Sequence, residues 1–127
     1  MTVLVDTSVL IDHLRNDPRA VRLLAELFAR EDDVWAATPT RTEILAGLRA
    51  GEQTPVTGLF AILSWIDIGI AIADEAGALA KRFRASHNRI DTTDYLIAAA
   101  AQSIGADLIT LNVKPFPMFA GLAPAYR

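Results

Sequence analysis

Short apolar runs alternate with longer stretches of helical spacing along the whole chain, and this alternation constrains the fold more than any other feature. The short runs are rich in β-forming residues and predict strands at residues 3–5, 34–37, 65–68 and 107–112. The longer stretches predict helices at residues 9–14, 18–30, 38–51, 56–63, 70–84 and 91–104. Strands separated by helices tend to pair in parallel, so we predict an α/β/α sandwich with a mostly parallel central sheet.

The length of the chain sets the number of domains. Its 127 residues suit one hydrophobic core, and no linker rich in Pro, Gly or Ser divides them, so we predict a single domain over residues 1–127. The sequence contains no cysteine. Any metal site must therefore use oxygen or histidine ligands, and a reducing compartment would suit the protein.

Nothing in the sequence predicts a membrane segment or a signal peptide. The first apolar run, Val3–Val5, is interrupted at once by Asp6, and no basic region precedes it. No apolar run approaches the roughly 18–20 residues that a membrane span needs. We therefore expect a soluble, cytoplasmic protein.

Charge and hydropathy indicate what kind of partner the chain suits. A formal net charge of −3 argues against binding nucleic acid by bulk positive charge, but it does not exclude a nuclease with its acids gathered at one site. Hydrophobic residues make up 52% of the chain, which is high for so small a domain. We expect part of this apolar surface to meet a partner.

Several polar residues stand where a parallel sheet places its ligand site, beyond the carboxyl ends of the strands. Asp6 directly follows the first predicted strand, and Asn112 ends the last one, with Thr110 two residues earlier on the same face. Glu43 and Asp94 lie in the first turns of helices whose N-termini can point at the same place. These positions, far apart in sequence, can form one pocket.

Each of these acids also has a structural interpretation as a helix cap. Asp6 precedes Thr7 and Ser8 and could cap the first helix. Glu43 stands three residues after Thr40, the spacing of a capping box, and Asp94 stands in the same relation to Asp91. No single acid is decisive. Helix caps, however, need not be carboxylates gathered at one sheet edge.

A group of carboxylates at one edge repels itself unless a divalent cation lies among them. Mg²⁺ is the expected ion, with Mn²⁺ as a possible substitute, because both prefer carboxylate and water oxygens and the chain has no thiol to recruit zinc. Such an ion can activate water and stabilise charge on a phosphodiester, so we predict phosphodiester hydrolysis. No nucleophile elbow or Gly-rich phosphate loop offers another chemistry, and neither His13 nor His87 has a partner at ligand spacing.

Four segments, in order along the chain, resemble the PIN-domain family and in particular its VapC-type toxins. They are VLVDTSVLID at residues 3–12, TEILAG at 42–47, IDTTDYLIAA at 90–99 and LITLN at 108–112. The third segment is the most specific, because an acid stands three residues before an Ile-Ala-Ala run. Together the segments span most of the chain.

The resemblance implies roles for individual residues. Asp6, Glu43 and Asp94 match the acidic, metal-binding positions of the family, and Asn112 completes the predicted catalytic set. Thr7 or Ser8 would hold water or phosphate beside them, and Asp91 would be either an accessory acid or a helix cap. The family often carries a further acid three residues after the Asn, where this chain has Pro115. The ligand set for a second metal ion therefore lacks this acid, and Asn112 would supply a neutral oxygen or contact a coordinated water.

The resemblance also implies a biological role and partners. Proteins of this type are endoribonuclease toxins that cleave structured RNA, such as tRNA or rRNA, and are silenced by a VapB antitoxin, usually as homodimers. Arg41 and Lys114 adjoin the site segments and are the preferred candidates for RNA phosphate contacts among the chain's basic residues. Tyr95 and Trp35 could stack a base, although core packing is the expected role of each.

Rival functions remain open. Asp6, Asp67 and Lys114 could belong to a phosphoacceptor signalling domain, but Glu43 and Asp94 would then have no role. A haloacid-dehalogenase-like phosphatase would need an Asp where Ser8 stands. A non-catalytic binding module would keep the fold and the apolar surface and need no metal.

Overall fold

In the computed structural model, which describes residues 1–87 and 89–126, four strands form one parallel sheet in the order β3-β2-β1-β4. Adjacent strands pair with Leu4 opposite Trp35, Val5 opposite Ile109 and Ala37 opposite Ile66. Because the pairing is parallel throughout, all the carboxyl ends lie at one edge. The strands are β1 (Thr2–Val5), β2 (Asp33–Ala37), β3 (Ser64–Ile66) and β4 (Asp107–Ile109).

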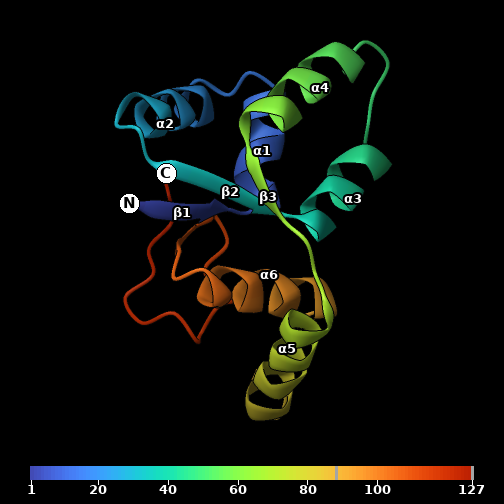
Figure 1. Ribbon diagram of the computed structural model, residues 1–127, viewed down its shortest axis with the longest axis vertical. Coiled ribbons are helices and arrows are strands. Elements are labelled where there is room, and N and C mark those ends of the chain that lie inside the picture. The colour runs from blue at the N-terminus through green and yellow to red at the C-terminus, as the bar shows by residue number, and fades with distance from the viewer. Residues whose placement is uncertain (88, 127) are drawn as a thin grey trace.

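Helices cover both faces of this sheet, as Figure 1 shows. One face carries α1 (Thr7–Leu14), α2 (Pro18–Ala29) and α4 (Gln53–Ile62), with α3 (Thr38–Ala46) beside the end of β2. The opposite face carries α5 (Ile70–Phe83) and α6 (Thr92–Ser103). This arrangement confirms the predicted sandwich. None of the helices in the described part of the chain is long and apolar enough to cross a membrane.

Side-chain alternation along the strands builds a separate core on each face. Val3 and Val5 of β1 pack into the cluster beneath α1, α2 and α4, whereas Leu4 between them packs into the cluster beneath α5 and α6. All three are at most 1% exposed. The short strand β1 is thus buried on both faces, as its continuous apolar run predicts.

Some element boundaries differ from the sequence-based prediction. The helix predicted to reach Gly51 ends at Ala46, with Gly47 as its C-cap. Beyond it, the backbone N–H of Arg49 donates to the side chain of Glu52 at 2.7 Å instead of to a helical carbonyl. The last strand ends at Ile109 rather than Asn112. In the last hydrogen bond between β1 and this strand, the backbone N–H of Asp6 donates to the Ile109 carbonyl at 2.8 Å. The residues after Ile109 therefore lie beyond the sheet.

The C-terminal tail, predicted as mostly irregular, has neither helix nor strand in its described part, but it is held in place. The backbone N–H of Ala125 donates to the Thr110 carbonyl at 2.8 Å. The hydroxyl of Tyr126 donates to Asp12 at 2.7 Å, and the guanidinium of Arg19 lies 4.9 Å from the centre of the Tyr126 ring. The tail therefore ties the segment after β4 to α1 and α2. Two residues, Asn88 of the predicted polar loop at 86–89 and Arg127, lie outside the described residues.

Candidate active site at the carboxyl edge of the sheet

Asp6 lies at the centre of the carboxyl edge, because it follows β1 and β1 has a strand on each side. Its side chain caps α1 and is only 7% exposed. Asp6 therefore caps a helix and also stands at the position of the predicted site, so its interpretation as a cap does not exclude a role in that site. Its extended backbone (φ −73°, ψ 158°) turns the chain from strand to helix at this point.

The carboxylate of Asp6 is held by three donors. The backbone N–H of Thr7 donates to Oδ1 at 2.8 Å, while the hydroxyls of Thr110 and Ser8 donate to Oδ2 at 2.8 and 3.3 Å. Burial nonetheless raises the pKa of Asp6 above its usual value, and these donors oppose that rise. Since an ionised carboxylate has about four acceptor positions, one remains for a ligand.

Glu43 reaches the same region from α3 through a hydroxyl relay. The Thr7 hydroxyl donates to Oε1 of Glu43 at 2.8 Å and lies 3.0 Å from the hydroxyl of the fully buried Thr40. Thr7 therefore bridges Asp6, through its backbone, and Glu43, through its side chain. The predicted capping box of Thr40 and Glu43 is wrong. The helix starts at Thr38, where the sequence also predicts its start, with Pro39 in its first turn and no side-chain cap. Thr40 therefore lies inside the helix, and Glu43 is free of a capping role.

Asp91 and Asp94 do form the predicted capping box of α6. The backbone N–H of Asp94 donates to Asp91 at 3.0 Å, and the side chain of Asp94 accepts from the Asp91 backbone at 3.4 Å. Asp94 is half-buried. Its burial, the adjacent Asp91 carboxylate and the charge of Asp6 together raise the pKa of Asp94 to about 7. The charge of Asp6 is the smallest of these influences.

The residues after β4 form the remaining side of the site. Thr110 is completely buried, and its hydroxyl also accepts the backbone N–H of Asn112 at 3.2 Å. Asn112 and Lys114 are both exposed and line a hollow with His87, Arg89, Ile90 and Pro115. The structure therefore brings Asp6, Thr7, Ser8, Glu43 and Thr110 into one hydrogen-bonded network, with Asp94 beside it and Asn112 at its rim.

These carboxylates suit a hard divalent ion that keeps part of its water shell. Within residues 1–87 and 89–126, no three His, Asp or Glu side chains are close enough to enclose a metal ion by themselves. Mg²⁺, however, is usually held by one or two carboxylates and several waters. Asp6 has a free acceptor position for such an ion, and a cation would relieve the burial and the repulsion that together raise the pKa of Asp94.

Other predicted residues lie elsewhere. The guanidinium of Arg41 is 4.4 Å from the centre of the Phe60 ring and 4.7 Å from that of Trp65, a stacked position typical of a structural cation–π contact. The proposed contact between Arg41 and RNA phosphate stays a prediction, and the stacked position of Arg41 does not support it. Tyr95 is 1% exposed, so it cannot stack a base, and Trp35 packs against the same core. Core packing is confirmed for both.

Two features of the site were not anticipated. Thr40 was interpreted as a helix cap, although its burial makes it a partner of Thr7, and only the position of Pro39 in the helix could have signalled this. His87 was given no role, yet it lines the hollow beside Asn112. A single histidine in a polar loop carries no sequence signal for such a position.

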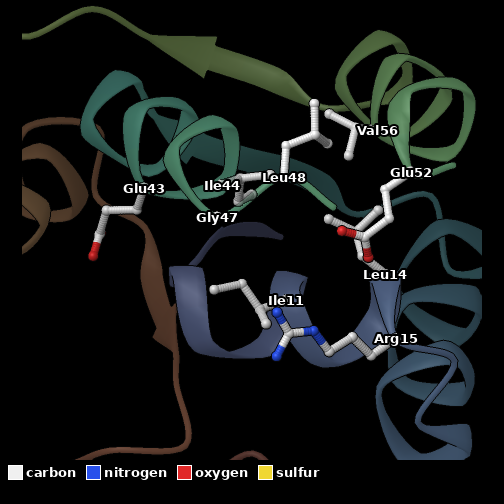
Figure 2. Close-up of a pocket in the computed structure, with 9 residues that line it drawn as sticks. All are labelled: Ile11, Leu14, Arg15, Glu43, Ile44, Gly47, Leu48, Glu52 and Val56. Atoms are coloured by element: carbon white, nitrogen blue, oxygen red, sulfur yellow. The ribbon is translucent and has the colours of Figure 1, made fainter. Parts of the chain in front are cut away.

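A second hollow, between α1, α3 and α4, is not part of the candidate site. Figure 2 shows it lined by Ile11, Leu14, Ile44 and Val56, with the carboxylate of Glu43 turned away at one end. Its volume of about 30 Å³ holds little more than one water molecule. Its lining is mostly apolar, so we consider it a packing gap between helices.

The strand order argues against a phosphoacceptor centre. Asp67 follows β3 and Lys114 follows β4, and these strands form the two opposite edges of the sheet. Asp67 is exposed, and the strand β2 separates its own strand from that of Asp6. The three residues of that rival interpretation therefore do not share one site, whereas Asp6, Glu43 and Asp94 share one edge.

Comparison with known proteins gives a consistent result. The model of the PIN domain family matches residues 3–120. The chain is 45% identical to Ribonuclease VapC19 of Mycobacterium tuberculosis over 97% of this chain and 98% of the relative, and 42% identical to Ribonuclease VapC10 of the same organism over 98% and 92%. Among solved structures, it resembles a chain of a toxin-antitoxin complex from Klebsiella pneumoniae with a TM-score of 0.81 and 25% identity, covering 98% of both chains.

Proposed function

The chain belongs to the PIN-domain family, among its VapC-type ribonucleases, and from this premise we propose that it is a Mg²⁺-dependent endoribonuclease toxin acting on structured RNA. One observation carries the assignment of the site. Asp6, buried at the centre of the carboxyl edge, is linked through Thr7 to Glu43 and electrostatically to Asp94. Structured RNA of the tRNA or rRNA kind is the proposed substrate class.

In this proposal Asp6, Glu43 and Asp94 would hold the ion, and Asn112 would supply a neutral oxygen to the ion or contact a coordinated water. A bound divalent ion supplies Lewis acidity, which activates water and stabilises the charge that develops on the phosphate. The protein contributes position. Thr110 and Ser8 fix the orientation of Asp6, and Thr7 fixes Glu43 relative to Asp6. Asp94 would bind the ion in its ionised form, so its raised pKa, about 7, would oppose ion binding at lower pH.

Incubation of the purified protein with total RNA tests the activity. We expect discrete fragments with Mg²⁺ or Mn²⁺ and none with chelator. Asp6→Ala and Asp94→Ala should abolish the fragments, whereas Asp67→Asn, which removes an exposed acid beyond β3, should leave them. Cleavage that persists in both alanine variants would overturn the site assignment.

We further propose that a VapB antitoxin inhibits the protein, that the toxin is a homodimer and that it acts in the cytoplasm. The supporting observations are the toxin-antitoxin complex among its structural neighbours and several exposed aliphatic side chains, namely Leu45 (49% exposed), Ile62 (57%) and Ile70 (84%). Light scattering of the isolated protein should give twice the monomer mass, and a co-expressed antitoxin should co-purify and suppress cleavage. A monomer that no antitoxin binds would refute these partners.

A further inference from the structure

We propose that the hollow between the α5–α6 loop and the segment after β4 holds one RNA nucleotide next to the scissile phosphodiester, with Arg89 and Lys114 on its phosphate. This inference rests on the proposed function and names how the substrate is held. The lining residues are His87, Arg89, Ile90, Asn112, Lys114 and Pro115. The volume of the hollow, about 550 Å³, lies within the range of about 300–1,000 Å³ typical of small-ligand sites.

Residues that line the hollow are close in sequence to the residues that form the carboxylate site. Arg89 and Ile90 precede Asp91, the cap of α6, so they lie next to the turn that carries Asp94. The backbone N–H of Asn112 donates to the hydroxyl of Thr110, and that hydroxyl donates to Asp6. A nucleotide in the hollow therefore lies beside the site where the metal and the scissile phosphate would meet.

The lining has the chemistry that a nucleotide needs. The half-buried Pro115 offers an apolar surface for the flat face of a base, and the small exposed part of Ile90, a core residue that is 9% exposed, adjoins it in the lining. The exposed amide of Asn112 can both donate to and accept from a base edge. Arg89 and Lys114 are exposed cations suited to a phosphate.

The other arginines with defined contacts are less free to bind RNA. Arg19 is paired with Asp17 at 2.6 Å and Arg30 with Asp32 at 3.1 Å. Arg41 lies over Phe60 and Trp65, and the Arg82 guanidinium is 5.2 Å from the centre of the Phe83 ring. Within residues 1–87 and 89–126, neither Arg89 nor Lys114 has a carboxylate partner within ion-pair distance.

The opposite flank of the carboxylates has a different character. A hollow of about 300 Å³ there is lined by Thr38, Pro39, Thr42, Glu43 and Thr93, a set that contains hydroxyls and an acid but no cation. The site is therefore asymmetric, with its positive charge on the β4 side. Since phosphate contacts fix the register of a nucleic acid, the cationic hollow is the flank that anchors the RNA strand.

RNA binding measured in chelator separates this proposal from catalysis. The probe is a fluorescent stem–loop RNA titrated with full-length protein over a series of salt concentrations. We expect the Arg89→Gln/Lys114→Gln variant to bind about tenfold more weakly and the slope of log K against log[salt] to fall by about 0.7, because each neutralised phosphate of a single strand contributes about 0.7. The matched control, Arg22→Gln/Lys81→Gln, removes the same charges from exposed positions on α2 and α5 and should change neither value.

Cleavage kinetics should show the same division. For the Arg89→Gln/Lys114→Gln variant we expect KM to rise about tenfold with kcat nearly unchanged, since these contacts are present in the ground state as well as the transition state. Unchanged affinity and salt slope in a variant that cleaves normally would overturn the hollow and leave the ribonuclease function intact. If the wild type never cleaves RNA but the variant still binds RNA more weakly than the wild type, the result would support the hollow and overturn the proposed function.

A mononucleotide titration tests whether the base is recognised as well as the phosphate. With adenosine 5′-monophosphate as the probe, we expect amide NMR shifts in residues 89–90 and 112–114 that are absent in the Arg89→Gln/Lys114→Gln variant. Inorganic phosphate at the same concentration should shift these amides less. Identical shifts from both probes, or shifts confined to other regions, would overturn a nucleotide subsite.

Discussion

The hydroxyl of Thr110 is a residue-scale determinant of the site, because it is completely buried and donates to Oδ2 of Asp6 at 2.8 Å. Thr110→Val keeps the volume and removes the donor. We predict a loss of about 1.5–3 kcal/mol of folding free energy at neutral pH, the usual range for a hydrogen bond to a charged group, and weaker metal binding as the pKa of Asp6 rises further. Urea unfolding and calorimetric Mn²⁺ titration measure the two effects.

Thr110→Ser is the matched control for this prediction, since it keeps the hydroxyl and loses only a methyl group. It should stay closer to the wild type than Thr110→Val in both stability and metal affinity. Equal losses in the two variants would show that packing, rather than the hydrogen bond to Asp6, is what Thr110 contributes.

Asp94 gives the metal-free protein a pH dependence of known sign. Its pKa is raised to about 7 in the fold from 3.8, so between these values the folded state holds a proton that the unfolded state has lost. The contribution of this residue to stability therefore falls as pH rises from about 4 to about 7 and then stays level. Asp94→Asn should remove this loss and be more stable above pH 7 by on the order of 1 kcal/mol, a value reduced because the side chain is still half solvated.

Unfolding of both proteins by urea across this pH range, in chelator, checks the prediction. The difference between Asp94→Asn and the wild type should be near zero at pH 4 and grow toward pH 7. A constant difference, or one that shrinks as pH rises, would contradict the raised pKa of Asp94.

At the scale of the element, the start of α6 separates capping from metal binding. Asp91→Ala should cost about 1 kcal/mol of stability, because it removes the N-cap bond to the Asp94 backbone, whereas Asp91→Asn should keep most of it, since Asn caps as well as Asp. If Asp91 is only a cap, Asp91→Asn also keeps the Mn²⁺ affinity. A drop of tenfold or more in that affinity would identify Asp91 as an accessory acid.

The elements themselves were largely predictable from the sequence, and the reasons for the exceptions are local. The strands were recognisable because a strand that is buried on both faces of a parallel sheet has a continuous apolar run. The longer stretches between these runs have helical spacing and predicted the helices. The end of α3 was missed because the turn after Gly47 depends on a side-chain bond between Glu52 and the Arg49 backbone. The tail was called irregular, and its anchoring by Tyr126 on Asp12 depends on a contact across 114 residues, which no local pattern encodes.

The candidate site was predictable in position but not in its connections. Strand ends and helix starts placed Asp6, Glu43, Asp94, Thr110 and Asn112 at one edge, because parallel strands share that edge. The bridge that Thr7 makes between Asp6 and Glu43 was not predictable, since its side-chain contacts join residues 33 and 36 positions apart, which no local pattern encodes. The catalytic and metal-binding roles of these residues stay predictions.

At the scale of the whole molecule, metal binding should stabilise the fold. An ion that binds only the folded state at 100 times its Kd adds about 2.7 kcal/mol to the free energy of unfolding, which raises Tm by roughly 10 °C for a domain of this size. Thermal unfolding with and without Mn²⁺ measures this shift. It should disappear in Asp6→Asn and persist in Asp67→Asn, and an equal shift in both variants would indicate binding away from the carboxyl edge.

Paramagnetic broadening by Mn²⁺ in NMR spectra tests the central claim most directly, because it locates the ion without relying on activity. At substoichiometric Mn²⁺, we predict that amide signals around Asp6, Glu43 and Asp94 broaden first and together, and that Mg²⁺ restores them by competition. Asp6→Asn should lose this effect. Broadening centred on any other region, or spread evenly over the exposed acids, would contradict a metal site formed by these three residues.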